Sequence, residues 1–299
     1  MSRIQDILSK AERDGTVRRT RALSADGHGT PTMTVPARPH VTPYEPVGPA
    51  GQAWTPGPAA ADTIDMDALR RLSGVLDRHL VAALAPQSLA AEQYRSLRTR
   101  IKRAEQGRAV RAIVVTSPNL GDGKSLTAAN LAITMAQEFQ QRVLLVDADL
   151  RRPSVHRMFG VAASPGLADV LMGATELSQA LVVLPDQHLT LLPAGPVPSH
   201  PAELLGSAAM RRLLDTLRAR FDRIIIDMPP ASPLADLNIV APMADGVLMI
   251  VRAGVTPKPA IERALAGLEA SKVLGLVLNE AGTTGSDTTT YEGYGYIAD

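Results

Sequence analysis

The chain has 299 residues, a hydrophobic content of 45% and a net charge of +1. This composition is ample for a folded core but argues against a nucleic-acid-binding surface over the whole protein. Cysteine is absent, which excludes disulfides and cysteine-type zinc sites, and no apolar run approaches the roughly 20 residues that cross a bilayer. We therefore expect a soluble, cytoplasmic protein with no membrane span.

Residues 1–22 predict a short amphipathic helix, because Ile4, Ile7, Leu8 and Ala11 recur with helical spacing. Two interpretations stay open for it: a helix that docks on a partner or an anionic membrane surface, and a charged terminus that frays. Residues 23–64 predict a flexible linker, since eight of the 23 prolines fall within residues 31–58 and few large apolar residues accompany them.

A second amphipathic helix is predicted over residues 65–84. Its apolar side chains Leu69, Leu72, Val75 and Leu80 are spaced for one face. Pro86 ends it, because proline cannot continue a helix.

A third helix, over residues 88–106, carries Glu92, Arg95 and Arg98 at steps of three, which brings them onto neighbouring parts of one face. The spacing alone favours a solvated face with one Glu–Arg pair, worth about 0.2–0.5 kcal/mol. The alternative is a patch of ion pairs between subunits.

From residue 111 onward, apolar strands alternate with helices. The predicted strands are residues 112–116, 143–146, 189–192, 224–226, 246–251 and 273–278, and the predicted helices are 125–138, 166–172, 176–182, 208–220, 235–243 and 259–271. This alternation is typical of an α/β protein whose parallel sheet is sandwiched by helices. In such sheets, ligands bind beyond the carboxyl ends of the strands.

The first of these strands leads into residues 117–125, Ser-Pro-Asn-Leu-Gly-Asp-Gly-Lys-Ser. The glycines let backbone N–H groups turn toward an anion, and the following helix adds positive charge at its N-terminus. Lys124 can reach the terminal phosphates of a nucleotide and the Ser125 hydroxyl can ligate Mg²⁺. Pro118 stands where this pattern usually begins with glycine, so a glycine-rich turn with a surface lysine is the alternative. The predicted nucleotide-binding residues are Gly121, Asp122, Gly123, Lys124, Ser125 and Leu126.

Acidic residues follow two of the predicted strands, at the same edge of the sheet as the loop. Asp147 and Asp149 come after residues 143–146, and Asp227 comes after residues 224–226. An apolar strand that ends in aspartate is the Walker B arrangement, which presents a carboxylate to Mg²⁺. Each aspartate taken singly could be a helix cap, but three beside a phosphate loop favour a catalytic site. Arg151 and Arg152 could pair with phosphate or with one of these acids.

With these motifs in place, residues 92–279 resemble the cytoplasmic bacterial tyrosine kinases of capsule and exopolysaccharide synthesis, which are relatives of the partition and septum-site P-loop ATPases. Gly-Asp-Gly-Lys-Ser resembles their Walker A motif, Asp147-Ala-Asp-Leu-Arg their Walker A′ motif and Ile-Ile-Ile-Asp227 their Walker B motif. The partition and septum-site ATPases carry a signature lysine five residues before the loop lysine. Asn119 is at that position here, which favours the kinase branch.

The resemblance implies a mechanism. Lys124 and Ser125 would bind phosphates and Mg²⁺, Asp149 and Asp227 would help hold Mg²⁺, and Asp147 would act on the attacking tyrosine as base or orienter. The γ-phosphoryl group of ATP would pass to a neighbouring subunit's tail, residues 283–299, which carries three spaced tyrosines where many relatives have a denser cluster. The acceptors would be Tyr291, Tyr294 and Tyr296.

The resemblance also implies an assembly. Glu92, Arg95 and Arg98 would build a homo-oligomeric ring, which reverses the preference that spacing alone gave. A membrane-spanning polysaccharide co-polymerase would activate the kinase at the inner membrane, and a cognate tyrosine phosphatase would reverse the modification. Two alternatives remain: a partition-type ATPase without a protein substrate, and a non-catalytic nucleotide-binding scaffold of a polysaccharide exporter.

Overall fold

The computed structural model describes residues 69–281, apart from 72–73, 106, 108, 139–140 and 232–235. The predicted N-terminal helix (1–22), linker (23–64) and tyrosine-bearing tail (283–299) lie outside the described residues. The predicted domain boundaries therefore stay predictions. Among the helices that are described, none is long and apolar enough to cross a membrane.

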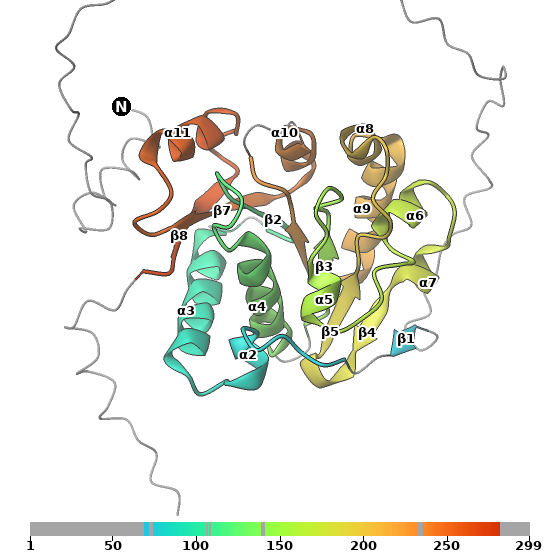
Figure 1. Ribbon diagram of the computed structural model, residues 1–299, viewed down its shortest axis with the longest axis horizontal. Helices are drawn as coiled ribbons and strands as arrows, with labels where there is room; N and C mark the ends of the chain where they lie inside the picture. Colours follow the sequence, from blue (N-terminus) through green and yellow to red (C-terminus); the bar gives the residue numbers. More distant parts are fainter. Residues whose placement is uncertain are drawn as a thin grey trace, which may run out of the picture. The chain divides into compact units, whose positions relative to one another are not determined.

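In the described part of the chain, an eight-stranded sheet has the order β1-β4-β5-β3-β6-β2-β7-β8 (Figure 1). The strands are β1 (Arg70–Arg71), β2 (Ala112–Thr116), β3 (Val143–Asp147), β4 (Val182–Leu184), β5 (Leu189–Leu192), β6 (Arg223–Asp227), β7 (Gly246–Arg252) and β8 (Val273–Asn279). All neighbouring pairs are parallel except β4 and β5, which are antiparallel. The predicted α/β fold is confirmed, with a mostly parallel sheet.

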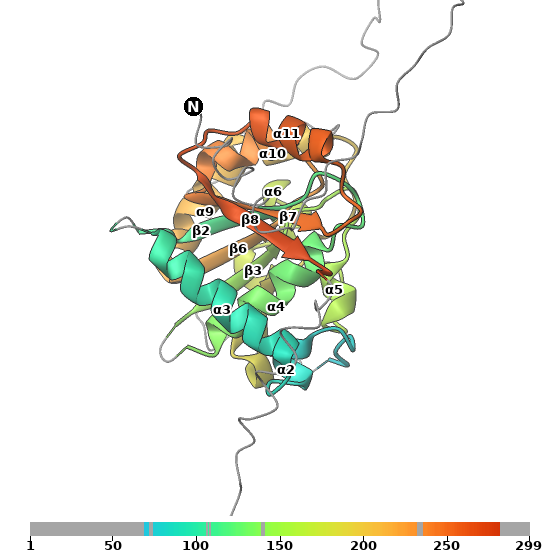
Figure 2. The ribbon, with the colours of Figure 1, turned by 90° about the vertical axis from the view of Figure 1, so that its left-hand side faces the viewer.

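Helices cover both faces of this sheet (Figures 1 and 2). On one face lie α2 (Val81–Leu84), α3 (Leu89–Ala104), α4 (Lys124–Ala136) and α5 (Val155–Met158); on the other lie α8 (Pro201–Leu205), α9 (Ala208–Arg220), α10 (Asp236–Val240) and α11 (Lys258–Ala266). The short helices α6 (Leu167–Leu171) and α7 (Leu177–Ala180) pack together, with α6 also against α9. Two 3₁₀ helices, η1 (Pro185–Gln187) and η2 (Ala241–Met243), precede β5 and β7.

Helix α4 and the central strands form the core that carries the phosphate loop. Every residue of β2 and β3 is buried, as expected for strands covered on both faces. All residues of α4 except Leu126 are buried as well, because α2, α3 and the sheet surround it. A helix enclosed in this way is rigid, so it fixes the position of the carboxyl end of the phosphate loop, which leads into the first residue of the helix.

The predicted helix over residues 65–84 is wrong. Its described part contains only the short strand β1 and the single turn α2. Gly74 lies so close to another segment that a Cβ there would be 2.0 Å from the carbonyl oxygen of Phe159, and the Asp77 N–H donates to the Met158 carbonyl at 2.8 Å. Contacts with this distant segment replace helical hydrogen bonds, in a stretch that a mid-helix glycine already disfavours.

The predicted helix over residues 176–182 is too long. Helix α7 ends at Ala180, and Val182 begins β4, a strand that the sequence did not predict. Val182 pairs with Leu191 of β5, so cross-strand pairing determines the conformation of this three-residue strand.

Candidate nucleotide and catalytic site

The predicted site residues meet at the carboxyl ends of β2, β3 and β6, three adjacent parallel strands. Asp147 and Asp227 are direct register partners at the ends of β3 and β6. The loop 117–123 leaves β2 beside them and runs into α4. Sheet topology therefore brings together the three motifs that are far apart in sequence.

The backbone of the loop has the shape that its glycines predict. Gly121 and Gly123 have φ angles of +88° and +95°, a region that side-chain-bearing residues rarely adopt. Gly123 is the N-cap of α4, so the first N–H groups of a 13-residue helix lie at the end of this loop. Free N–H groups at a helix start form an anion site, which fits the triphosphate of a nucleotide.

The Lys124 ammonium lies among the groups predicted to hold magnesium. Its Nζ is 2.8 Å from Asp149 Oδ2 and 3.7 Å from Asp227 Oδ1, and it donates to Ser125 Oγ at 3.0 Å. Burial by itself lowers the pKa of Lys124, but the charges of Asp227 and Asp149 outweigh it and raise the pKa. The lysine is therefore a fixed cation at the point where loop and carboxylates meet.

Asp227 is fully buried, and neither of its carboxylate oxygens has a hydrogen-bond partner. Burial raises its pKa to about 6, against the opposing attraction of Lys124. Buried polar atoms normally have hydrogen-bond partners, so a carboxylate whose two oxygens lack a hydrogen bond, and have only the Lys124 ammonium at 3.7 Å, indicates a ligand site.

The donor set at this point fits Mg²⁺, which prefers oxygen ligands and keeps several waters. Ser125, Asp149 and Asp227 all lie around the Lys124 ammonium and supply only oxygen atoms. Within the described residues, no three His, Asp or Glu side chains are grouped closely enough to hold a metal alone.

Asp147 is held by three backbone donors. Its Oδ1 accepts from Asp149 N at 3.2 Å, and its Oδ2 accepts from Ser154 N at 3.1 Å and Val155 N at 3.0 Å. Burial, followed by the charge of Asp227, raises its pKa to about 7 despite these hydrogen bonds. The carboxylate is fixed in orientation, and Oδ1, which accepts only one of the three hydrogen bonds, retains further acceptor capacity.

Arg151 pairs with an acid that the motif analysis did not include. Its guanidinium makes a bidentate contact with Asp236 at the start of α10, with Nε–Oδ2 and Nη2–Oδ1 distances of 2.7 and 2.9 Å. Asp236 is fully buried, so the pair links the segment after β3 to α10. The suggested pairing of Arg151 with one of the three motif acids is wrong.

Asp122 does not direct its side chain toward a nucleotide. The carboxylate accepts from Asn119 N at 2.8 Å and from Thr256 Oγ1 at 2.7 Å, while Asn279 Nδ2 donates to the Asp122 carbonyl at 3.0 Å. Sequence reasoning missed Thr256, which lies after β7, and Asn279, which ends β8, because neither belongs to a recognisable motif. Only the topology, which places the ends of β7 and β8 beside the loop after β2, identifies them.

The three residues predicted to build a ring all make contacts within the chain. Arg95 donates to Glu92 Oε2 at 2.7 Å, the single exposed pair that the spacing alone predicts. Arg98 instead binds α4 and the residues after it, through the Thr134 carbonyl at 2.7 Å and Glu138 at 3.4 Å. The predicted acceptors Tyr291, Tyr294 and Tyr296 lie outside the described residues.

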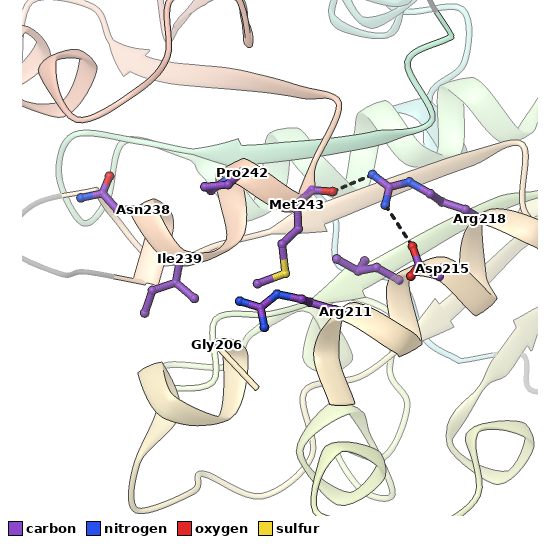
Figure 3. Close-up of a pocket in the computed structure, with 9 residues that line it drawn as sticks. Gly206, Arg211, Asp215, Arg218, Asn238, Ile239, Pro242 and Met243 are labelled. Carbon is purple, nitrogen blue, oxygen red and sulfur yellow. Dashed lines mark hydrogen bonds and ion pairs between the residues drawn. The ribbon is translucent and has the colours of Figure 1, made fainter. Parts of the chain in front are cut away.

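A cavity of about 670 Å³ lies between α9 and the segment from α10 to η2. Figure 3 shows Met243 and Arg211 side by side in it, and Arg218 joined to the Met243 carbonyl and to Asp215. None of the predicted site residues lines it: the lining is Gly206, Arg211, Leu214, Asp215, Arg218, Asn238, Ile239, Pro242 and Met243. The cavity is therefore separate from the phosphate loop.

The fold and the loop together define a P-loop NTPase, which implies nucleotide binding. Residues 108–292 match the ParA family, described as NUBPL iron-transfer P-loop NTPase. The chain has no cysteine, the usual ligand of iron–sulfur clusters, so iron transfer is not carried over to it.

Relatives narrow this class. The chain is 39% identical over 232 residues to the tyrosine-protein kinase YwqD of Bacillus subtilis (strain 168), which covers 77% of this chain and 95% of that protein. It is 35% identical over 228 residues to the succinoglycan biosynthesis transport protein ExoP of Rhizobium meliloti (strain 1021), covering 74% of this chain but only 28% of that protein. The kinase domain of Escherichia coli tyrosine kinase ETK superposes with a TM-score of 0.65 at 29% identity, covering 70% of this chain and 82% of that domain. The chain belongs to the bacterial tyrosine-protein kinases of capsule and exopolysaccharide biosynthesis.

Proposed function

We propose that this chain uses ATP and Mg²⁺ to phosphorylate Tyr291, Tyr294 and Tyr296 in the tail of a neighbouring subunit. The observation that carries the proposal is the convergence of Lys124 with Asp149 and Asp227 at one edge of the sheet. Phosphoryl transfer depends on a fixed cation and on carboxylates that bind a metal beside the phosphates, and the placement of Lys124, Asp149 and Asp227 supports these roles.

Each side chain has a role in this reaction. The N–H groups at the start of α4 and the Lys124 ammonium would bind the β- and γ-phosphates. Ser125, Asp149 and Asp227 would hold Mg²⁺, which when bound offsets the negative charge of the phosphate oxygens. Asp147, fixed by three backbone donors, would accept the proton of the tyrosine hydroxyl. As the tyrosine oxygen forms its bond to the γ-phosphorus, the bond between that phosphorus and the leaving oxygen of ADP would break.

Assembly and location form the second part of the proposal. Glu92, Arg95 and Arg98 of α3 would contribute to a homo-oligomeric ring that brings each tail to the next subunit's site. A membrane-spanning polysaccharide co-polymerase would activate the kinase, keeping it cytoplasmic but peripheral to the inner membrane, and a cognate tyrosine phosphatase would reset it. The name of ExoP, a biosynthesis transport protein, supports a link to polysaccharide export.

A mixing experiment tests transfer between subunits. Lys124→Met removes the phosphate-binding cation but keeps the tail, whereas the triple variant Tyr291→Phe, Tyr294→Phe, Tyr296→Phe keeps the site and removes the acceptors. With Mg²⁺ and ATP, we expect neither variant alone to gain phosphotyrosine in mass spectrometry. Mixed, the Lys124→Met chain should be phosphorylated on its tail tyrosines by the other.

Two results would contradict this function. Wild-type protein that carries no phosphotyrosine, even with its membrane co-polymerase present, would rule out the kinase mechanism. Steady phosphate release with unmodified tyrosines would support a partition-type ATPase instead, which Asn119 at the signature-lysine position disfavours.

A further inference from the structure

Asp122 poses an electrostatic problem in the phosphate loop. Its carboxylate is 2% exposed and lies two residues before Lys124, in a loop that would bind a polyphosphate. A buried carboxylate so close to phosphate oxygens repels them unless other groups compensate it. A role for Asp122 must therefore come from what its side chain binds.

Both carboxylate oxygens of Asp122 point into the protein. Oδ2 accepts from the N–H of Asn119 at 2.8 Å, which closes the loop on itself. Oδ1 accepts from the Thr256 hydroxyl at 2.7 Å, a contact between residues 134 positions apart. The carboxylate thus shapes the loop and attaches it to the segment between β7 and α11.

Two hydrogen bonds with Arg252 fix the position of Thr256, whose hydroxyl contacts Asp122. Its Oγ1 accepts from the Arg252 N–H at 2.9 Å, and the Thr256 N–H donates to the Arg252 carbonyl at 3.0 Å. The turn between them includes Gly254, whose φ angle of +68° favours glycine. Because Oγ1 is already an acceptor, its one proton is directed to Asp122.

The end of β8 adds a third contact to the same residue. Asn279, the last residue of β8, donates from Nδ2 to the Asp122 carbonyl oxygen at 3.0 Å. Its side chain also lies against Gly123, where a Cβ would be 2.1 Å from Nδ2. Side chain and backbone of Asp122 are therefore fixed by two different strand ends.

We propose that Thr256 is a positioning residue for nucleotide binding, which acts through Asp122 to hold residues 119–123 in the shape that receives the phosphates. Thr256 itself touches no reacting group. This inference takes one point from the proposed function, which is that the bound nucleotide is ATP. Loss of the hydroxyl leaves Oδ1 of Asp122 without its donor and detaches the loop from the segment after β7, while Oδ2 keeps the Asn119 N–H. The loop must then be ordered during binding, and the less compensated charge repels the phosphates.

The test compares Thr256→Val, which keeps the shape but lacks the hydroxyl, with Thr256→Ser, which restores the hydroxyl. We measure the affinity for the fluorescent analogue mant-ATP with Mg²⁺, and the KM for ATP and kcat of tail phosphorylation. In Thr256→Val we expect both Kd and KM to rise about tenfold, equivalent to ~1.4 kcal/mol, while kcat changes less. Thr256→Ser should stay within about twofold of wild type.

A matched control separates positioning from general stability. Thr216 donates its hydroxyl to the Arg212 carbonyl at 3.0 Å on α9, away from the loop. Thr216→Val makes the same chemical change but loses only an exposed hydrogen bond within one helix, and we expect its denaturation midpoint to fall slightly with no change in Kd. If Thr256→Val behaves like Thr216→Val, with an unchanged Kd, the proposal is wrong.

Two further readouts keep the test decisive. If Thr256→Val does not fold, Asp122→Asn, which can no longer accept hydrogen bonds on both side-chain atoms, should weaken mant-ATP binding in the same direction, and unchanged affinity would overturn the proposal. Binding of mant-ATP does not require phosphoryl transfer, so the two claims can fail separately. If the wild-type protein binds the analogue but forms no phosphotyrosine, the proposed kinase function is contradicted, and the comparison of Kd between wild type and Thr256→Val still tests the role of Thr256.

Discussion

Two aspartates near the two ends of strand β6 have pKa values displaced in opposite directions. Asp222, just before the strand, accepts three hydrogen bonds from Arg142 at 2.9–3.2 Å, and these lower its pKa. Asp227, at the end of the strand, is buried without a hydrogen-bond partner for either oxygen, with the Lys124 ammonium 3.7 Å from Oδ1, and its pKa is raised to about 6. One carboxylate stabilises the fold, and the other costs stability at the site where it is needed.

We predict that Asp227→Asn stabilises the protein at pH 7.5 without nucleotide or Mg²⁺, and abolishes phosphoryl transfer. A folded-state pKa above the ordinary 3.8 means that the folded protein binds this proton more tightly, so folding loses stability as pH rises from about 4 to about 6. Removing the charge should raise the free energy of unfolding by roughly 1–3 kcal/mol. Urea unfolding of both proteins in EDTA measures this difference in the free energy of unfolding.

We predict that Asp222→Asn, the same chemical change, lowers the free energy of unfolding at pH 7.5, whereas Asp227→Asn raises it. Its lowered pKa contributes stability that is present above about pH 4 and lost as pH falls further. The pair with Arg142 is largely exposed, so the loss at pH 7.5 should stay below about 1 kcal/mol. At pH 3 both variants should approach wild type. An Asp227→Asn protein that is less stable than wild type at pH 7.5 would contradict the inference that the buried charge of Asp227 destabilises the fold.

At the scale of elements, the turn from loop to helix α4 depends on Gly123. Its φ angle of +95° is unfavourable for any other residue, and an added Cβ would lie 2.1 Å from Asn279 Nδ2. Gly173 has a similar φ of +71°, with nothing within 4 Å of a Cβ. The two glycines therefore separate backbone strain from the collision between the loop and β8.

We predict that Gly173→Ala costs about 1 kcal/mol of stability, from the left-handed conformation alone, and leaves ATP binding unchanged. Gly123→Ala should cost more, and should weaken mant-ATP binding at least about tenfold, because the loop and Asn279 must both shift. Thermal unfolding and fluorescence titration measure the two effects. Equal ATP affinity in both variants would show that the close approach of Asn279 does not matter for binding.

The elements that the sequence predicts well are those whose own residues determine them. The buried strand over residues 112–116 has the predicted bounds, and α9 matches the predicted helix over residues 208–220. Both have an uninterrupted pattern, apolar in the strand up to its last residue, Thr116, and apolar on one face in the helix. The acids at the strand ends are equally predictable, because parallel strands deliver their carboxyl ends to one edge.

The features that were missed depend on distant partners. Residues 65–84 have helical spacing, yet in their described part Gly74 and Asp77 make backbone contacts with Phe159 and Met158 instead of helical ones. Thr256 and Asp236 are ordinary residues in their own segments, and become important only because folding places them against Asp122 and Arg151. No local pattern encodes such pairs, so one sequence cannot reveal them.

At the scale of the whole molecule, α3 has two kinds of arginine. Arg98 connects α3 to the carbonyl oxygen of Thr134, and its side chain is 22% exposed. Arg95 and Glu92 remain on the outer surface, with side chains 31% and 47% exposed. An assembly through this helix would therefore use the outer pair directly, while Arg98 holds the helix in position.

We predict that Arg95→Ala prevents ring assembly while lowering the free energy of unfolding by about 1 kcal/mol or less, since both of its contacts, the ion pair with Glu92 and a hydrogen bond to the Pro86 carbonyl at 2.8 Å, are exposed. Arg98→Ala should also weaken assembly, but with a loss of roughly 1.5–3 kcal/mol, because a charged hydrogen bond between α3 and α4 disappears. Sedimentation velocity with Mg²⁺ and ATP reports the assembly, and urea unfolding reports the stability.

The comparison is decisive because the two arginines lie one turn apart on the same helix and differ in their partners. If Arg95→Ala sediments like wild type, the outer pair takes no part in assembly, and the interpretation that spacing alone favoured, a solvated face, is correct. If it sediments as a monomer with unchanged stability, the exposed pair acts between subunits. Loss of tail phosphorylation in that monomer would then connect assembly to transfer, since under the proposed mechanism each tail would need a neighbour's Lys124 and Asp147.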